Sequence, residues 1–167
     1  MSELLDGIYS VVYRSGEHRT IQLRTPEAGK PLAGKRILSY RQRDDWKGFG
    51  FLVNDTPNGK PAVAFWRKFR AENAPKRLER IEFAVRTILE NPAKAGLAYA
   101  LRENRCCRCG MQLTVPASVA FGMGPECARK RGWTKEDKLK AFEWAKSQVP
   151  DVTVQTDLSY GPLEESA

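Results

Sequence analysis

The sequence predicts an α+β fold, with a small antiparallel β-barrel or β-sheet in the first half of the chain and helices in the second. Residues 6–66 hold short runs of Val, Ile, Tyr and Phe separated by Gly, Pro, Asn and Asp, the pattern of strands joined by turns. From residue 75 the apolar side chains recur at helical spacing instead. All four cysteines fall within residues 106–127, which sets that segment apart from both halves.

Five strands are expected in the first half of the chain, at residues 7–13, 19–24, 36–41, 48–53 and 62–66. Turns are expected at residues 15–16, 29–31, 44–45 and 57–59, where Gly, Pro, Asn and Asp gather. Five short strands favour a small barrel of the OB-like or SH3-like kind. Period-two patterning leaves an open antiparallel sheet as the alternative.

Two helices are expected to follow the strands. Leu78, Ile81, Val85 and Ile88 share one helical face after Pro75, a residue suited to the first turn. A second helix is expected to begin at residues 91–92, where an asparagine cap precedes a proline, and to run through Leu97 and Leu101 into the cysteine region.

The pattern divides the chain into five parts. These are a β-barrel or sheet domain at 1–72, a helical connector at 73–104, a zinc-binding module at 105–133, a C-terminal helix at 134–149 and an acidic flexible tail at 150–167. Residues 134–137 resemble a capping box that opens the last helix, and Pro150 ends it.

The charge of the chain is unevenly placed. Its 28 basic and 20 acidic residues give +8, but the segment after Gln148 holds four acidic side chains and no basic one, so residues 1–148 carry +12. Such a body attracts polyanions, and DNA or RNA is the partner class that this charge favours. No run of about 18 apolar residues is present, and no secretory leader is recognised, so we expect a cytoplasmic protein without a membrane partner.

Cys106, Cys109 and Cys127 are expected to bind zinc. A C-x2-C pair on one tight turn directs two thiolates to a common tetrahedral centre, and Gly110 eases the backbone behind it. Pro125 suits a first helical position and places Cys127 in the first turn of a helix. A knuckle, a loop and a ligand at a helix start form a treble-clef-like zinc finger.

The fourth zinc ligand is left open by the sequence. Position 130, where a treble clef usually has its last ligand, is Lys130. His18, the only histidine, is one candidate, and Cys107 is the other. A disulfide or plain buried thiols are the alternative to a metal site.

The pattern Cys-x2-Cys-Gly…Gly-x-Gly-Pro-x-Cys at residues 106–127 resembles an uncharacterised zinc-binding module of bacteriophage and actinobacterial proteins. Residues 6–9 and 18–20 resemble the N-terminal part of phage proteins that carry this module. The resemblance implies a phage or mobile-element origin, hence host cytoplasm, and a metal site. It implies no reaction.

The segment Lys47-Gly48-Phe49-Gly50-Phe51 resembles the first ribonucleoprotein motif of RNA-recognition and cold-shock domains. Residues 62–66 stand where a cold-shock domain has its second aromatic strand. On a regular strand Phe49 and Phe51 share a face and could stack on bases. The alternative is that both fill the barrel interior.

We therefore expect a non-enzymatic, zinc-containing nucleic-acid-binding accessory protein, with single-stranded substrates favoured. The alternative is a phage protein that binds and modulates a host protein, such as a defence nuclease or a transcription component. An enzyme is not expected, because one histidine and no paired catalytic acids leave little catalytic equipment. The expected nucleic-acid contacts are Lys47, Phe49, Phe51, Phe65, Trp66, Arg67, Lys68, Arg70, Arg108, Arg129, Lys130 and Arg131.

Overall fold

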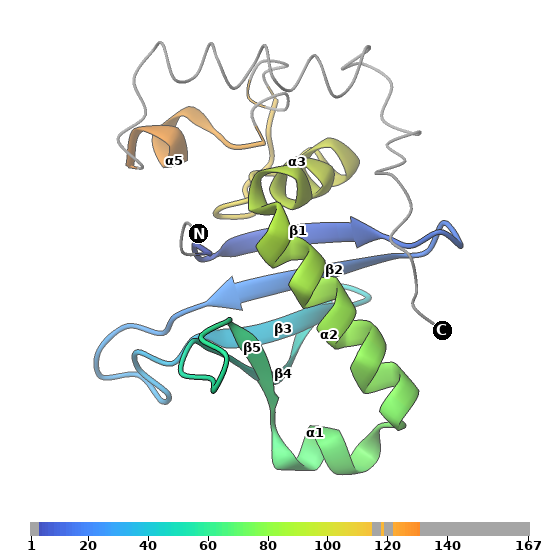
Figure 1. The fold of residues 1–167 in the computed structure, drawn as a ribbon. Coiled ribbons are helices and arrows are strands. Elements are labelled where there is room, and N and C mark those ends of the chain that lie inside the picture. Colours follow the sequence, from blue (N-terminus) through green and yellow to red (C-terminus); the bar gives the residue numbers. More distant parts are fainter. Residues whose placement is uncertain (1–3, 115–117, 119–121, 131–167) are drawn as a thin grey trace.

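The protein was analysed as a computed structural model, which describes residues 4–114, 118 and 122–130 (Figure 1). The helix expected at 134–149 and the tail expected at 150–167 lie outside the described residues. Within the described part, no helix is both long enough and apolar enough to span a bilayer.

The first half of the chain forms an open, five-stranded antiparallel sheet. Its strands follow one another in the order β1-β2-β3-β4-β5, so that β1 and β5 are the edges. The strand positions expected from the alternating pattern are confirmed, and of the two expected forms the structure shows the sheet. The strands are β1 (Gly7–Val12), β2 (His18–Arg24), β3 (Ile37–Gln42), β4 (Asp45–Val53) and β5 (Ala62–Phe65).

Both helices expected after the strands are confirmed. Pro75 opens α2 (Pro75–Glu90), and Asn91 caps α3 (Pro92–Glu103) by accepting a hydrogen bond from the Lys94 backbone N–H at 3.1 Å. The structure adds a short helix, α1 (Arg67–Glu72), that the sequence did not predict. The last described helix, α5 (Pro125–Lys130), begins at the predicted proline.

One hydrophobic core joins the sheet to α2. The helix lies across one face of the sheet and contacts both β1 and β5 (Figure 1). Its periodic side chains Ile81, Val85 and Ile88 are buried against that face. The sheet contributes Tyr9, Val11, Tyr13, Ile21, Leu23, Leu38, Phe49 and Leu52 to the same core.

A β-bulge in β4 changes which side chains face this core. Leu38 of β3 pairs with Gly50, but the next residue, Ser39, pairs with Gly48, so Phe49 is an extra residue in β4. An extra residue inverts the alternation beyond it. Phe49 and Leu52 therefore both face the core, and Phe51 faces the other side of the sheet. The expectation that Phe49 and Phe51 share a face was wrong for this reason.

Candidate metal centre and nucleic-acid interface

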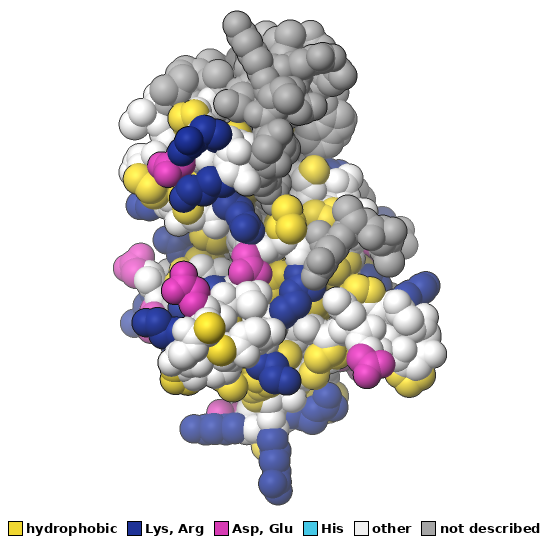
Figure 2. All heavy atoms as spheres, turned by 90° about the vertical axis from the view of Figure 1, so that its left-hand side faces the viewer, with side chains coloured by type: hydrophobic (Ala, Val, Ile, Leu, Met, Phe, Trp, Pro, Cys, Tyr) yellow, Lys and Arg dark blue, Asp and Glu magenta, His cyan; other side chains and the backbone are white. Residues whose placement is uncertain are grey.

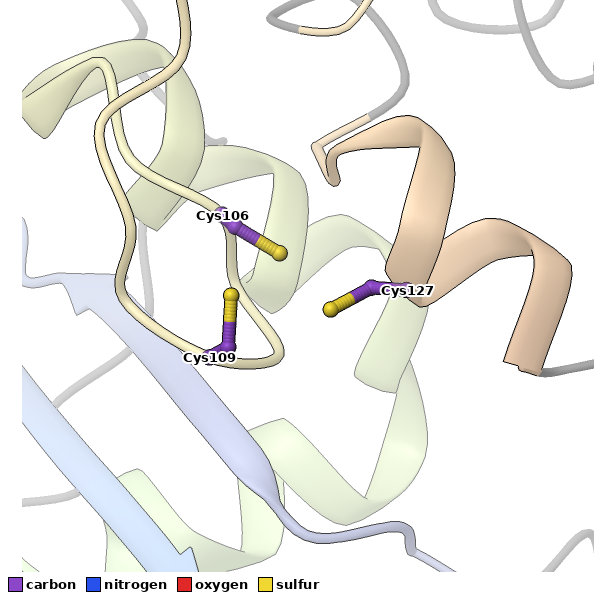
Figure 3. Close-up of side chains that lie close together, drawn as sticks. All are labelled: Cys106, Cys109 and Cys127. Carbon is purple, nitrogen blue, oxygen red and sulfur yellow. The ribbon is translucent and has the colours of Figure 1, made fainter.

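Three cysteine side chains converge at one point. Cys106 and Cys109 come from the loop after α3, Cys127 comes from α5, and Figure 3 shows their sulfur atoms pointing toward one another. The three Sγ atoms lie within 4.8 Å of one another. Thiolates around a tetrahedral ion with bonds of about 2.3 Å are about 3.8 Å apart. The group is therefore close enough to hold a metal ion.

A tight turn positions the first two cysteines. The Gly110 N–H donates to the Cys106 carbonyl at 2.8 Å, and Gly110 has φ +77°, a conformation that favours glycine. The Cys106 N–H in turn donates to the Met111 carbonyl at 2.8 Å. These bonds fold the chain back on itself, so the C-x2-C spacing brings two sulfurs to one side.

The buried thiol of Cys106 is prepared to ionise. Burial alone disfavours its thiolate, but backbone N–H groups of Cys109, Gly124 and Arg108 surround the sulfur, and the net result is a lowered pKa of Cys106. One of these donors, the Arg108 N–H, lies 3.4 Å from the sulfur. Hydrogen bonds from the backbone thus take the place of solvent around the anion.

The pKa of the Cys127 thiol is shifted in the opposite direction. Burial, followed by the neighbouring Cys109 and Cys106 thiols, raises the pKa of Cys127 to about 12. Three sulfurs this close cannot all carry charge at neutral pH unless a cation balances them. The three thiol groups thus form a donor set that can hold a metal ion.

Neither candidate for the fourth ligand is brought to the three sulfurs. The Sγ atom of Cys107 lies 3.2 Å from the position that a Cβ on Gly96 would take, so this side chain packs against α3. His18 pairs with Val12 at the far end of β1, whereas Cys107 is hydrogen-bonded to Ile8. Those two β1 residues are about 13 Å apart at the rise of a strand.

The cysteine module is docked onto the rest of the protein. The Ile8 N–H donates to the Cys107 carbonyl at 2.5 Å, along the outer edge of β1. The Arg108 guanidinium donates to the Asp6 carbonyl. A Cβ on Gly122 would lie 3.5 Å from the Leu97 Cα, so the loop before α5 contacts α3 closely. Residues 105–130 thus share contacts with both the sheet and α3.

The structure separates the predicted aromatic residues into two groups. Phe49 is fully buried and Phe65 half-buried, with their ring centroids 6.0 Å apart, inside the core that also holds Tyr40 and Phe69. Phe49 therefore cannot stack on a ligand, and the alternative that it fills the interior is the correct one. Phe51 and Trp66 are half-buried on the opposite face, with ring centroids 5.7 Å apart.

Trp46 joins Phe51 and Trp66 on that face. The Trp66 ring lies over Gly48, and Trp46 and Gly48 are alternate residues of β4 that pair with Arg41 and Ser39 on the same side of β3. The three rings thus follow β4 along the face opposite α2. We name Trp46, Phe51 and Trp66 the aromatic row. Sequence reasoning missed Trp46, although its place directly before the KGFGF segment and its alternation with Gly48 could have indicated it.

Residues 96–132 match a family of unknown function (DUF6011). The matched segment runs from Gly96 of α3 through the module and holds all three converging cysteines. Searches of curated proteins and of solved structures found no match.

The predicted cationic residues are spread over the surface. Lys47 lies on β4, Arg67, Lys68 and Arg70 lie on α1, and all four are exposed; Arg129 and Lys130 are exposed on α5. Arg108 is half-buried and bound to the Asp6 carbonyl, and Arg131 lies outside the described residues. Figure 2 shows Lys and Arg side chains spread over the coloured part of one face, mixed with acidic side chains.

Proposed function

We propose that Cys106, Cys109 and Cys127 hold a structural zinc ion in a treble-clef-like module. Among the residues that the structure describes, the buried core of the module is formed by Cys106, Leu113, Met123 and Ala128. Two of these side chains are small, so a bound ion would add folding free energy that they supply only in part. Because Cys107 and His18 are directed elsewhere, we propose that a solvent molecule completes the tetrahedron.

Metal analysis of purified variants tests the ligand set. We expect about one zinc per chain in the wild type, in Cys107→Ser and in His18→Ala, and loss of the ion in Cys109→Ser and Cys127→Ser. Cys107→Ser is the matched control, because it removes a thiol from the same turn. Loss of zinc in Cys107→Ser or His18→Ala would identify the fourth ligand and overturn the solvent assignment.

We further propose that the protein binds single-stranded nucleic acid through the aromatic row, without catalysing a reaction. The observation that carries this proposal is the line of three half-buried rings on the sheet face opposite α2. Alternate residues of a strand are about 6.7 Å apart, a spacing over which unstacked bases can lie on successive rings. Unpaired bases offer these π-faces, whereas those of a duplex are stacked.

Cations near the aromatic row supply the phosphate contacts in this proposal. Lys47 pairs with Tyr40 of β3 and therefore faces the side of the sheet that α2 covers. The cations beside the row are Arg67 and Lys68, since α1 begins directly after Trp66 and carries both on its exposed surface. The residues are thus adjacent in the chain to the rings that would hold the bases. Each phosphate neutralised releases counterions, so affinity falls steeply as salt rises.

Fluorescence anisotropy with labelled single-stranded DNA and RNA at two salt concentrations tests the proposal. We expect salt-dependent binding that weakens about tenfold or more in Trp46→Leu/Phe51→Leu, because stacking contributes roughly 1–3 kcal/mol per base. Phe83→Leu is the matched control, since Phe83 is a half-buried ring on α2. Absent binding, salt-independent binding, or an equal loss in the control would contradict the proposal.

A further inference from the structure

A cleft opens in the sheet where β2 begins and β3 ends. The β2–β3 pairing stops at Ile21↔Tyr40, whereas β1–β2 pairing continues to His18 and β3–β4 pairing continues to Gln42. Here β2 stays paired with β1 and β3 stays paired with β4, while β2 and β3 separate from each other. The resulting cleft has a volume of about 500 Å³, within the range of small-molecule sites. This is the right-hand end of both strands in Figure 1.

The cleft is lined by cations. Arg19 comes from β2, Arg41 from β3, Arg43 from the turn between β3 and β4, and Arg77 from α2. One carboxylate, Glu103 of α3, also lines it. The other lining residues are His18, Thr20, Tyr40 and Gln42.

Three of these guanidinium groups form no ion pair with a carboxylate among the described residues. Glu103 pairs with Arg41 at 3.4 Å, and in the described part of the chain no acidic side chain forms an ion pair with Arg19, Arg43 or Arg77. The Nε atom of Arg19 is buried and has no hydrogen-bond partner among the same residues. Buried donors are normally satisfied, so this nitrogen is an unusual unpaired donor on a side chain that lines the cleft.

Arg77 is held in place at the cleft. Its guanidinium carbon lies 5.6 Å from the centre of the Tyr40 ring and 6.0 Å from that of Phe69. Its Nη2 atom lies 3.4 Å from the Tyr40 hydroxyl. Stacking of this kind fixes the plane of a guanidinium and leaves its donors directed outward, the arrangement that recognises phosphate oxygens bidentately.

We propose that this cleft binds a terminal phosphate or pyrophosphate group of a nucleotide. Three guanidinium groups without an ion pair among the described residues favour a ligand with at least two negative charges, and a phosphomonoester carries nearly two at neutral pH. The volume exceeds the need of one phosphate and leaves room for a sugar. The ligand is either a free nucleotide or the phosphorylated end of a strand. The site shares no side chain with the aromatic row, so it stands independently of the proposed function.

Isothermal titration calorimetry with inorganic pyrophosphate tests the site. We expect one binding event in the wild type and affinity lowered about tenfold or more in Arg77→Gln and in Arg43→Gly. Arg86→Gln is the matched control, because Arg86 lies on α2 and stacks on Phe83 at 5.3 Å but does not line the cleft. No binding in the wild type, or an equal loss in the control, would overturn the site.

Arg43→Gly keeps this test independent of folding. Arg43 has φ +56°, a conformation that glycine adopts more easily, so the substitution removes a charge without destabilising the turn. If both variants keep the wild-type melting temperature and still bind pyrophosphate normally, the cleft is not a phosphate site.

Oligonucleotides distinguish the two sources of the phosphate. A 5′-phosphorylated strand that binds more tightly than its 5′-hydroxyl counterpart, with the difference abolished in Arg77→Gln, assigns the site to strand ends. Equal affinity for both strands with retained pyrophosphate binding assigns it to free nucleotides. Trp46→Leu/Phe51→Leu should lose strand affinity and keep pyrophosphate affinity, so failure of one proposal can be told from failure of the other.

Discussion

Gly48 lies directly beneath the indole ring of Trp66. A Cβ at this position would stand 2.4 Å from Cη2 and 2.7 Å from Cζ3 of that ring, far inside contact distance. At Gly50, a Cβ would stand 2.4 Å from the Ala64 carbonyl oxygen of β5. Both glycines of the KGFGF segment are therefore explained by packing between β4 and its neighbours.

We expect Gly48→Ala to lower the free energy of unfolding by about 1–3 kcal/mol, because the methyl group must displace a packed ring. Urea unfolding measures the change. In a Trp66→Ala background the same substitution should cost much less, since the ring is gone. An equal cost in both backgrounds would show that the Trp66 contact does not determine the need for glycine.

We expect His18 to make the free energy of unfolding depend slightly on pH. Burial, and then the neighbouring Arg102 charge, lowers the pKa of His18 below its usual 6.5. The unfolded chain therefore binds more protons than the folded one just below pH 6.5, and stability falls with acidification. The contribution is fully present above pH 6.5 and is lost as the pH falls through the folded-state pKa.

His18→Gln should flatten this dependence. Urea midpoints between pH 5 and 7.5 for the wild type and the variant measure it, and the difference between the two curves removes the background of other acids and thiols. We expect a modest effect, because the His18 side chain is only partly removed from solvent and its residue surface remains largely accessible. Parallel curves for the two proteins would contradict the expectation.

At the scale of elements, α2 and α3 meet at one residue. The Asn91 N–H donates to the Thr87 carbonyl at 3.3 Å and so ends α2, while the Asn91 side chain caps α3. Pro92 then begins the second helix. One residue thus ends α2 and caps α3.

Asn91→Ala should therefore destabilise the protein by about 1 kcal/mol, because the Lys94 N–H loses its acceptor. Asn91→Ser, which restores a capping oxygen, should recover most of the loss. Thermal unfolding followed by circular dichroism measures both. Equal stability of the alanine and serine variants would show that the cap contributes nothing.

The elements that the sequence predicted are those with a repeating signal. Strand alternation and the spacing of Ile81, Val85 and Ile88 act over many residues, so they indicate type and place. The helix α1 has six residues and no side-chain cap, which leaves nothing to recognise. The bulge at Phe49 is defined by how β4 pairs with β3, which the sequence does not show. The side of the sheet on which Phe51 lies could therefore not be deduced.

The cysteine group could be predicted from the sequence, whereas the arginine cleft could not. The three cysteines converge as predicted because their spacing encodes a turn and a helix start. The arginine cleft was not predicted, since Arg19, Arg43 and Arg77 come from three separate elements and meet only where β2 and β3 part. The order of charged residues along the chain does not show where β2 and β3 separate, so it could not predict the cleft.

At the scale of the whole molecule, the cysteine module and the sheet should unfold together. Backbone contact at Ile8 and Cys107, and packing of Gly122 on α3, join the two parts. We expect removal of the proposed metal ion by a chelator to lower the melting temperature of the whole protein, measured by calorimetry. A separate low-temperature transition, with that of the sheet unchanged, would show that the parts are uncoupled.

The bond from Ile8 to Cys107 also protects an edge strand. The outer side of β1 carries backbone donors and acceptors that could pair with a strand of another molecule, and the cysteine turn occupies one of these donors. Loss of the proposed metal ion would loosen this contact and leave the edge of the sheet open to self-association. The proposed ion would then protect the protein against aggregation as well as stabilise its fold, and metal-starved cells would accumulate insoluble protein.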